Sequence, residues 1–491
     1  MRRRRKVWFI EPGGLPARPM NAWITRWPLL GPITLATILH ERGFDAAVYN
    51  ESISGPVEGN SDAYAEICSA DVVGISIMTP TAARGYAIAD RLRRDAPNVR
   101  IVIGGVHATF MPDEAHAHAD VVVRGEGETI IEAVARGEID GGVVRAEPLA
   151  DLDRIPTLNH FLVRDFDKLL ALCRKRELYE LPMMTSRGCP YGCTYCSVTR
   201  MFGRRVRRQS VGKVCRDVRR HLEQGFRSLF FYDDNFITDR AWTRDLLERL
   251  APMRVRFNAQ ARVDFHWADA RRQRLDTGVL RALRRGGCNL LFIGYETIDE
   301  ATARRWHKGY RGGQSLPDRL RQDTRILHDQ GIWIHGMFVM GPEHTRRTAR
   351  GIVDFARRCE IESIQVSVLT PFPGTPLFEE MRPHLLLNDF PADWNYYDAA
   401  HCVYDHGRLG LAGLQEAVID AHKWFYRISS WRSRTLRHLA ARPMTFADKV
   451  LDLWTGFRTS RNMVREWHSD SQEFIEMNHG PGLRTIAVAR P

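Results

Sequence analysis

The sequence has no uncharged hydrophobic run that reaches the roughly 18 residues a membrane-spanning helix needs. Basic residues fill the start, Met1–Lys6, but the apolar stretch that follows, Val7–Ile10, is too short for a secretory signal and ends at Glu11-Pro-Gly-Gly. The nine cysteines are odd in number and most stand alone, so they do not form a disulfide framework. We therefore expect a cytoplasmic protein with at most peripheral membrane contact.

Acidic residues are outnumbered, because 71 Lys and Arg stand against 59 Asp and Glu and leave a net charge of +12. Such an excess suits nucleic acid, anionic lipid or phosphorylated substrates as partners. It equally suits an arginine-rich protein whose helices expose solvated basic faces. No nucleic-acid-binding motif accompanies the charge, so we expect no nucleic-acid partner.

The 491 residues are enough for two or three domains, and the first part alternates strand and helix patterns. Short, β-branched strands are expected at 6–10, 45–50, 71–78, 100–106 and 120–124. Five such strands with crossover helices predict an α/β unit over residues 1–145, with a flavodoxin-like doubly wound parallel sheet. Residues 146–181 lack the residue pattern of a strand and are expected to form a connector.

A second α/β series is expected over residues 182–379, with strands at 182–186, 228–232, 256–261, 289–295, 333–340 and 363–369. Six strand–helix repeats predict a partial (β/α)6 barrel of the TIM type that is not fully closed. Residues 380–491 are helix-like, aromatic and basic. Within them, His422–Arg442 permits either an amphipathic surface that meets lipid or a helical cap whose aromatic side chains pack on the barrel.

Ligands of a doubly wound sheet bind beyond the carboxyl ends of its strands. Small residues there let a bulky ligand approach the backbone closely. The candidate binding residues at these ends are Ser76, Met78, Thr79, Gly104, Gly105, His107, Gly125 and Glu126. By themselves they are moderately specific, because such sheets host many ligands.

Charged side chains also follow the expected barrel strands, at the edge where α/β barrels build their active sites. Asp233 and Asp234 follow the second strand, Arg262 ends the third and Glu296 ends the fourth. Any one of them could serve as a helix cap or salt-bridge partner. Their recurrence around one mouth favours a binding site.

The strongest signal is the run Arg187-Gly-Cys-Pro-Tyr-Gly-Cys-Thr-Tyr-Cys, which spaces Cys189, Cys193 and Cys196 as Cys-x3-Cys-x2-Cys. Three thiolates so close can bind three corners of a [4Fe-4S] cluster and leave the fourth iron open for a small molecule. A structural zinc site needs four ligands in paired knuckles, and a ferredoxin needs a fourth thiolate at a family spacing. Neither pattern accompanies these cysteines, so we predict a catalytic, open-site cluster.

These cysteines, with Tyr195 before the third and a barrel around them, resemble the radical S-adenosylmethionine (SAM) superfamily. The resemblance implies that SAM binds the open iron and is cleaved by one electron to a 5′-deoxyadenosyl radical, which abstracts hydrogen from an unactivated C–H bond. It places Tyr195 near the adenine, Asp233 and Asp234 at the methionyl amine, Arg262 at the methionyl carboxylate and Glu296 at the ribose. The usual Gly-Gly-Glu of the second strand is not literally present. A one-electron reductant such as flavodoxin or ferredoxin is also implied.

Across roughly residues 5–400 the order of parts resembles the subclass with an N-terminal cobalamin-binding domain. Its loops are matched by Ser76-x-Met78, Gly104-Gly105, His107 and Gly125-Glu126-Gly-Glu. The Asp-x-His-x2-Gly motif, whose histidine ligates cobalt in other cobalamin enzymes, is missing. We therefore expect base-off cobalamin without a histidine ligand. His107 would contact the corrin edge or nucleotide tail, and is the alternative cobalt ligand; an empty, vestigial domain is the other alternative.

The leading hypothesis is a cobalamin-dependent radical SAM methyltransferase that acts on an unactivated carbon through the 5′-deoxyadenosyl radical and methylcobalamin. An alternative keeps both cofactors but carries out oxidation, cyclisation or rearrangement without methyl transfer. A non-enzymatic alternative is a cobalamin- or redox-sensing protein. The expected substrate is a small molecule, and the sequence leaves open whether it is a lipid or another natural-product scaffold.

Overall fold

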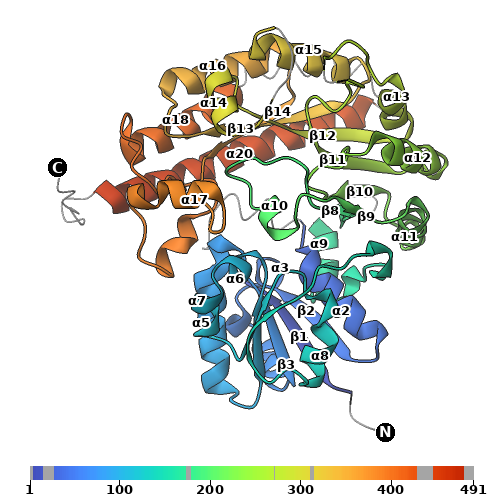
Figure 1. Cartoon of the computed structure of the whole chain (residues 1–491), viewed down its shortest axis with the longest axis vertical. Coiled ribbons are helices and arrows are strands. Elements are labelled where there is room, and N and C mark those ends of the chain that lie inside the picture. The colour runs from blue at the N-terminus through green and yellow to red at the C-terminus, as the bar shows by residue number, and fades with distance from the viewer. Residues whose placement is uncertain are drawn as a thin grey trace.

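The computed structural model describes residues 4–14, 27–172, 179–269, 271–309, 314–427 and 446–479. Two six-stranded parallel sheets dominate this part of the chain, and a helical region follows the second sheet. Figure 1 shows the N-terminal unit, which is the first sheet with its helices, in blue beneath the barrel, with the C-terminal helices lying along the barrel in orange and red. The α/β class and the order of parts are those expected from the sequence.

The first sheet has the strand order β2-β1-β3-β4-β5-β6, with every neighbouring pair parallel. Its strands are β1 (Lys6–Glu11), β2 (Asp45–Asn50), β3 (Val72–Ser76), β4 (Arg100–Gly104), β5 (Val121–Arg124) and β6 (Gly142–Arg145). The five expected strands are confirmed. The sixth, β6, was missed because its side chains alternate between half-buried and exposed, as at a sheet edge, and carry little apolar signal.

Helices cover both faces of this sheet, which is the doubly wound arrangement. They are α2 (Leu30–Glu41), α3 (Glu51–Ser54), α4 (Ser61–Cys68), α5 (Ala82–Asp95), α6 (Val106–Phe110), α7 (Pro112–His116) and α8 (Ile131–Arg136). Figure 1 shows α2 and α8 on one side of the strands and α5, α6 and α7 on the other. The strand order reverses between β1 and β3, so a crevice opens at their carboxyl ends.

A mostly irregular segment joins the two sheets and contains η4 (Leu152–Arg154), η5 (His160–Leu162) and α9 (Phe166–Leu172). Its side chains Leu149, Leu152 and Ile155 form a small apolar cluster of their own. This agrees with the absence of strand rhythm in the sequence.

The second sheet has the order β14-β13-β12-β11-β10-β7, so that strands follow one another in chain order, as in an open barrel. They are β7 (Glu180–Met183), β10 (Ser228–Phe231), β11 (Arg256–Arg262), β12 (Cys288–Glu296), β13 (Trp333–Met340) and β14 (Ser363–Val368). The connecting helices are α10 (Val198–Met201), α11 (Val211–Glu223), α12 (Arg240–Leu250), α13 (Thr277–Arg285), α14 (Glu300–Arg305), α15 (Leu316–His328) and α16 (Arg346–Arg358). The predicted six-stranded partial barrel is confirmed.

The C-terminal region contains α17 (Pro376–Met381), η8 (Arg382–His384), η9 (Ala392–Tyr396), α18 (Gly410–Phe425) and α20 (Phe446–His479). Helix α18 covers the open edge of β14. The amide of Val366 donates to His422 Nε2 (3.1 Å), and the Tyr426 hydroxyl bonds both backbone groups of Ile364 (3.0 and 2.8 Å). The helical cap is therefore the structure of residues 422–427, whereas Trp431 and the arginines beyond it lie outside the described residues.

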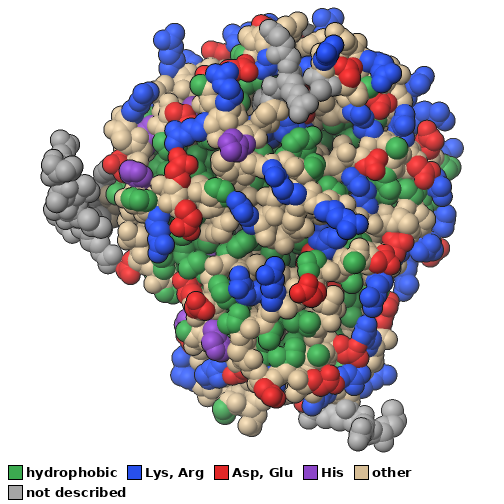
Figure 2. Space-filling view, in the orientation of Figure 1, with side chains coloured by type: hydrophobic (Ala, Val, Ile, Leu, Met, Phe, Trp, Pro, Cys, Tyr) green, Lys and Arg blue, Asp and Glu red, His purple; other side chains and the backbone are tan. Residues whose placement is uncertain are grey.

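No helix among the described residues is long and apolar enough to cross a membrane. Figure 2 shows Lys and Arg scattered over the visible face and interspersed with Asp and Glu rather than gathered in one block. This distribution agrees with solvated basic faces as the origin of the net charge.

Candidate functional site

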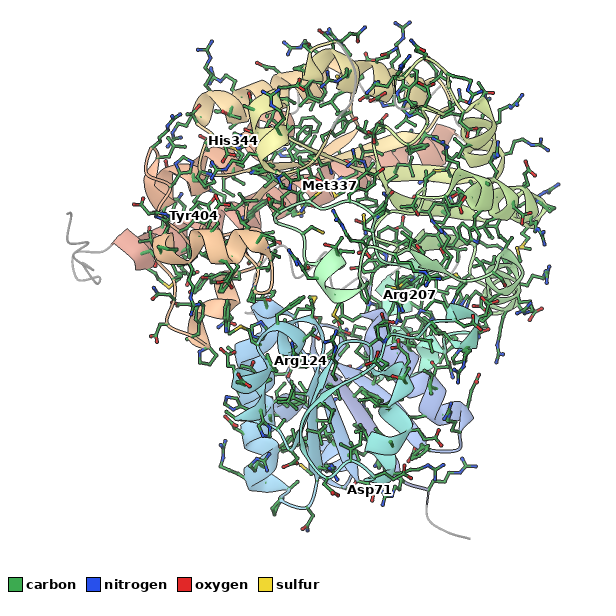
Figure 3. All side chains as sticks on the ribbon, in the orientation of Figure 1. Asp71, Arg124, Arg207, Met337, His344 and Tyr404 are labelled. Carbon is green, nitrogen blue, oxygen red and sulfur yellow. The ribbon has the colours of Figure 1, made fainter. Side chains whose placement is uncertain are left out.

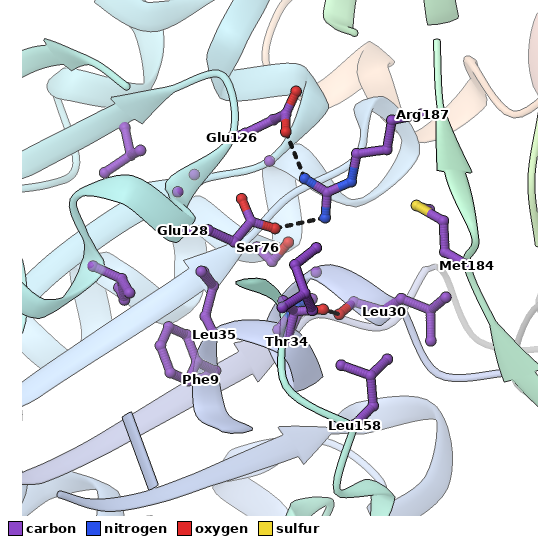
Figure 4. A pocket seen from close by; sticks show the side chains of 18 of the residues that line it. Phe9, Leu30, Thr34, Leu35, Ser76, Glu126, Glu128, Leu158, Met184 and Arg187 are labelled. Atoms are coloured by element: carbon purple, nitrogen blue, oxygen red, sulfur yellow. Dashed lines mark hydrogen bonds and ion pairs between the residues drawn. The ribbon is translucent and has the colours of Figure 1, made fainter. Parts of the chain in front are cut away.

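A cavity lies at the carboxyl edge of the first sheet, where it faces the barrel. On the N-terminal side it is lined by Phe9 of β1, Ser76 at the end of β3 and the glycines that follow β4 and β5. On the barrel side it is lined by Met183, Met184, Arg187, Met201 and Phe202, so both halves of the molecule close it (Figure 4). It holds about 1290 Å³ of empty space, including its open mouth. The lining is mostly apolar, with a few polar groups, as is usual for a cofactor site.

Five of the residues predicted to bind a cofactor in the N-terminal unit line this cavity: Ser76, Gly104, Gly105, Gly125 and Glu126. Gly105 has φ +100°, and a Cβ there would lie 2.6 Å from the carbonyl oxygen of Ile77. Gly125 has φ +87° and would bring a Cβ to 3.1 Å from the carbonyl oxygen of Ala146. Both positions therefore need glycine, because of the left-handed conformation and the close approach of neighbouring backbone.

Met78, Thr79 and His107, also predicted to bind the cofactor, are not among the residues that line this cavity. Met78 precedes the short turn η2 (Thr79–Thr81), and its amide donates to the Thr81 hydroxyl (3.1 Å). His107 is fully buried, with its ring nitrogens 3.3 Å from the Thr79 hydroxyl and 3.2 Å from Glu114. Both ring nitrogens of His107 are therefore engaged by side chains of the N-terminal unit rather than directed at the cavity.

The three cysteines lie in one loop, residues 188–206, which we call the cluster loop. It is held at both ends by the antiparallel pair β8 (Ser186–Arg187) and β9 (Arg207–Arg208). Gly188 has φ +91°, and a Cβ there would meet the carbonyl oxygens of Arg205 and Gly203 at 2.7 and 2.9 Å. The glycine before Cys189 is therefore required for the loop to close on itself.

Cys189, Cys193 and Cys196 are all free thiols and partly exposed. Burial raises the pKa of Cys189, and raises that of Cys196 to about 12, and the charges of the three sulfurs also act on one another. Among the described residues no three His, Cys, Asp or Glu side chains already surround one metal position. The donor set nevertheless fits an iron–sulfur cluster, because three thiols come from a single short loop that contains no fourth cysteine.

Further along, the cluster loop is anchored to the opposite side of the barrel. The Thr194 amide donates to the carbonyl of Trp306 (3.3 Å), and the Leu377 amide donates to the carbonyl of Thr194 (3.2 Å). The Tyr195 ring packs edge-on against Trp306, with 5.7 Å between ring centroids. Tyr195, predicted to lie near the adenine, is therefore held against Trp306, the residue that follows α14.

The two adjacent aspartates after β10 take different roles. Asp233 is fully buried and accepts hydrogen bonds from the Ser186 hydroxyl (2.5 Å) and from the hydroxyl and amide of Thr185 (2.9 and 3.2 Å). Burial raises its pKa to about 6, against these donors. Its oxygens thus link the end of β10 to the start of the β8–β9 hairpin. This structural role was not part of the prediction, which was a contact with the methionyl amine.

Asp234 is solvent-accessible although protein surrounds it on most sides. Burial and the neighbouring charge of Asp233 raise its pKa to about 7, while the charge of Arg187 lowers it. The charge of Asp234 also acts on Cys189 and Cys196, so it lies near the cluster loop. Of the two aspartates, Asp234 has the carboxylate that is open toward a ligand.

Arg262 ends β11 and is nearly buried. It forms a two-pronged ion pair with Asp264 (3.0 and 3.1 Å) and donates to the carbonyls of Lys308 and Gly309 (3.1 and 3.2 Å). Its guanidinium lies 4.0 Å from the ring centre of Tyr191, within the cluster loop. In this arrangement Arg262 supports the cluster loop. The sequence predicted a different role for it, the pairing with the methionyl carboxylate.

Glu296 ends β12 in a strained left-handed conformation (φ +61°), next to an irregularity in the pairing of β12 with β13. Its carboxylate pairs with the nearly buried Lys308 at 2.8 Å. Lys308 was missed by sequence reasoning, since it lies 12 residues away and outside any motif. The pair presents an acceptor and a donor together at this strand end.

A buried network of four charges joins the two units, and sequence reasoning missed its partners. Arg187, just before the cluster loop, donates to Glu126 and to Glu128, each at 2.6 Å. Arg207, just after the loop, pairs with Glu126 and donates to the carbonyl of Leu149 (2.7 Å). Figure 3 places Arg207 where the barrel meets the N-terminal unit.

The protein resembles known proteins in both units. A B12-binding-domain model matches residues 25–135, and a radical SAM superfamily model matches residues 183–356. The cobalamin-dependent SAM radical enzyme OxsB, solved with aqua-cobalamin and SAM bound, shares the fold, with a TM-score of 0.66 over 98% of this chain and 82% of OxsB at 16% identity.

Sequence relatives cover most of the chain. Bacteriochlorophyllide d C-12(1)-methyltransferase of Chlorobaculum tepidum is 28% identical over 88% of this chain and 89% of its own length. An uncharacterized methyltransferase of Pyrococcus horikoshii is 30% identical over 72% of this chain and 78% of its own. An anaerobic magnesium-protoporphyrin IX monomethyl ester cyclase of Cereibacter sphaeroides is 25% identical over 72% and 60%.

The fold and the three-cysteine loop define a radical SAM barrel preceded by a B12-binding domain. The chain belongs to the cobalamin-dependent radical SAM enzymes. Methyltransferases predominate among its relatives, and a minority are cyclases.

Proposed function

We propose that this protein is a cobalamin-dependent radical SAM methyltransferase that acts on an unactivated carbon of a small molecule. The observation that carries the proposal is the shared cavity, which glycine-rich strand ends of the B12-binding domain line on one side and Arg187, Met201 and Phe202, at and within the cluster loop, line on the other. A cavity shared by the two units suits a methyl group that would pass from a cofactor in one unit to a reaction in the other. We assign residues 1–145 to cobalamin binding, 146–181 to the connector, 182–379 to the barrel and 380–491 to the helical cover.

When bound, SAM would supply both a methyl group and a hydrogen-abstracting radical. Cobalamin would carry the methyl group from SAM to the substrate. Cys189, Cys193 and Cys196 would hold three irons of the cluster. Asp234 would take the methionyl ammonium as a charge-assisted hydrogen bond. The remaining candidates act nearby: Tyr195 would lie against the adenine, the Glu296–Lys308 pair would meet the ribose hydroxyls, and Arg262 would reach the methionyl carboxylate if it exchanged one of its present partners.

We further propose that cobalamin binds base-off with no histidine below the cobalt. Support comes from the missing Asp-x-His-x2-Gly motif and from the burial of His107 between Thr79 and Glu114. A flavodoxin or ferredoxin would supply electrons from outside. Tyr191, exposed at 40% in the cluster loop, suits a docking point close to the cysteines.

Methyl-labelled SAM tests the proposal. The anaerobically reconstituted enzyme would be incubated with a reductant, cobalamin, trideuteromethyl-SAM and candidate acceptors, with bacteriochlorophyllide-type macrocycles first because the relative named for them matches nearly the whole chain. We expect a product heavier by the labelled methyl group, and none from the triple variant Cys189→Ala, Cys193→Ala, Cys196→Ala. A converted but unlabelled product would contradict methyl transfer.

That contrary outcome would support a second candidate, a radical oxidation or cyclisation with the same cofactors. The relative named as a magnesium-protoporphyrin ester cyclase favours it. The two candidates share every cofactor residue above, so the fate of the methyl label separates them.

A further inference from the structure

Resting on the proposed function, we infer that Arg187 and Arg207, with Glu126 and Glu128, form a clamp that sets the distance between the two cofactor sites. The four side chains come from two loops. Glu126 and Glu128 follow β5 in the loop that lines the cavity, and Arg187 and Arg207 are the residues directly before and after the cluster loop. Figure 4 shows Arg187 reaching across the cavity to both glutamates.

The clamp is buried and its charges balance. The side chains of Arg187, Glu126 and Glu128 are 8%, 2% and 6% exposed. Burial alone would raise the pKa of Glu126, but hydrogen bonds from Arg207 and the charge of Arg187 hold it below its ordinary value. Two arginines and two glutamates thus meet in a site shielded from solvent, where opposite charges attract strongly and the hydrogen-bond geometry is restrictive.

The clamp lies next to the first residues of the cluster loop. Only Gly188 separates Arg187 from Cys189, and the backbone packs so closely there that a Cβ would meet the carbonyl oxygens of Gly203 and Arg205. On the other side, Glu126 follows Gly125, where a Cβ would lie 3.1 Å from the carbonyl oxygen of Ala146. A displacement of either glutamate would therefore be passed through Arg187 and one residue of closely packed backbone to the first cysteine.

The clamp differs from ordinary surface ion pairs of the same chain. Arg249 and Asp245 on α12 form a pair of similar length (2.8 Å), but both side chains are about half exposed. Exposed pairs of this kind contribute little. Arg249→Gln is therefore a control for Arg187→Gln, since both variants replace one ion-paired arginine by glutamine, at an exposed and at a buried place.

The direct test is a distance measurement on the holoenzyme. Pulsed electron paramagnetic resonance between cob(II)alamin and the reduced cluster reports the cobalt–cluster distance distribution without any turnover. We expect the distribution to shift or broaden in Arg187→Gln and in the milder Glu128→Gln, which leaves Glu126 paired with Arg207. We expect Arg249→Gln to match the wild type.

A second readout uses the two products of SAM in the absence of acceptor. Transfer of the methyl group to cob(I)alamin uses its electron pair to form the cobalt–carbon bond and releases S-adenosylhomocysteine. Reductive cleavage at the cluster takes one electron and one hydrogen atom and releases 5′-deoxyadenosine and methionine. Because a displacement of about 1 Å can cost on the order of 100-fold in rate, we expect S-adenosylhomocysteine to fall tenfold or more relative to 5′-deoxyadenosine.

Unchanged distance distributions in both clamp variants would overturn the inference, as would an equal fall of both products. If Arg187→Gln does not fold, the distance distribution and the product ratio of Glu128→Gln test the inference instead. A wild-type enzyme that forms no S-adenosylhomocysteine would instead count against the proposed methyl transfer, and the distance measurement would still test the clamp.

Discussion

Glu114 of α7 accepts a hydrogen bond at 3.1 Å from the indole nitrogen of Trp394, which lies 280 residues later in η9. The same carboxylate contacts His107, whose ring meets Trp394 edge-on at 5.0 Å. Close by, Gly374 lies so near to Phe110 that a Cβ would come within 2.2 Å of its ring. The segment after the barrel therefore fastens back onto the B12-binding domain at a point separate from the Arg187 clamp.

Removal of the Trp394 side chain should destabilise the protein strongly. Trp394 is fully buried and stacks on Phe390 at 3.6 Å between ring centroids. Trp394→Ala should cost about 3–5 kcal/mol of unfolding free energy, as for other large-to-small core changes. Trp394→Phe keeps most of the packing and loses the donor to Glu114, which should cost about 1–3 kcal/mol. Urea unfolding measures both, and equal losses in the two variants would refute the role of packing.

The two adjacent aspartates should respond in opposite ways to the same change. Asp233→Asn places an amide opposite the donors of Ser186 and Thr185 and should cost about 1–3 kcal/mol of stability. Asp234→Asn should leave stability within about 0.5 kcal/mol, as for an exposed side chain.

The kinetic effect of Asp234→Asn should instead be on SAM binding. Loss of a charge-assisted hydrogen bond worth about 1.5–3 kcal/mol would raise the KM for SAM roughly 10- to 100-fold. Formation of 5′-deoxyadenosine measures this KM. If Asp233→Asn raises the KM while Asp234→Asn does not, the assignment of the amine contact is reversed.

Buried His422 should make the protein less stable in acid. Burial lowers its pKa from 6.5 to about 4, against the hydrogen bond from Nδ1 to the carbonyl of Val418, which raises it. Nε2 accepts from the Val366 amide, an arrangement that only the neutral ring can make. The unfolded chain therefore binds more protons between these values, so the free energy of unfolding falls as the pH drops through that window.

At pH 5 the loss from His422 should be about 2 kcal/mol relative to pH 8. Urea unfolding of the wild type and of His422→Gln at both pH values isolates this contribution from those of other groups. The variant should lose less stability than the wild type on acidification. Equal losses would mean that His422 is not held neutral in the folded protein.

The state of bound cobalamin provides a prediction about His107. If the cobalt has no histidine below it, the cob(II)alamin spectrum in electron paramagnetic resonance should lack splitting from a nitrogen ligand. Replacement His107→Ala should leave that spectrum unchanged while lowering stability, because it leaves Thr79 and Glu114 with one partner fewer. Nitrogen splitting that disappears in the variant would show that His107 reaches the cobalt.

Strands and cofactor motifs could be predicted from sequence because their signals are local. Strands β2 and β13 match their predicted bounds, since runs of β-branched and apolar residues mark them directly. The roles of Asp233, His107 and Arg262 could not be predicted. Asp233 and His107 bind residues that are distant in the chain or outside any motif, and Arg262 binds carbonyl groups 46 and 47 residues away besides the nearby Asp264. The same holds for the clamp, where Arg187 and Glu126 are 61 residues apart.

The central claim is that one protein uses SAM in two ways, as a methyl donor to cobalamin and as a radical source at the iron–sulfur cluster. Its most direct test measures 5′-deoxyadenosine and S-adenosylhomocysteine from the reduced, cluster-reconstituted enzyme with and without added cobalamin. We predict 5′-deoxyadenosine in both cases and S-adenosylhomocysteine only with cobalamin. S-adenosylhomocysteine that forms equally without cobalamin, or no 5′-deoxyadenosine at all, would contradict the account.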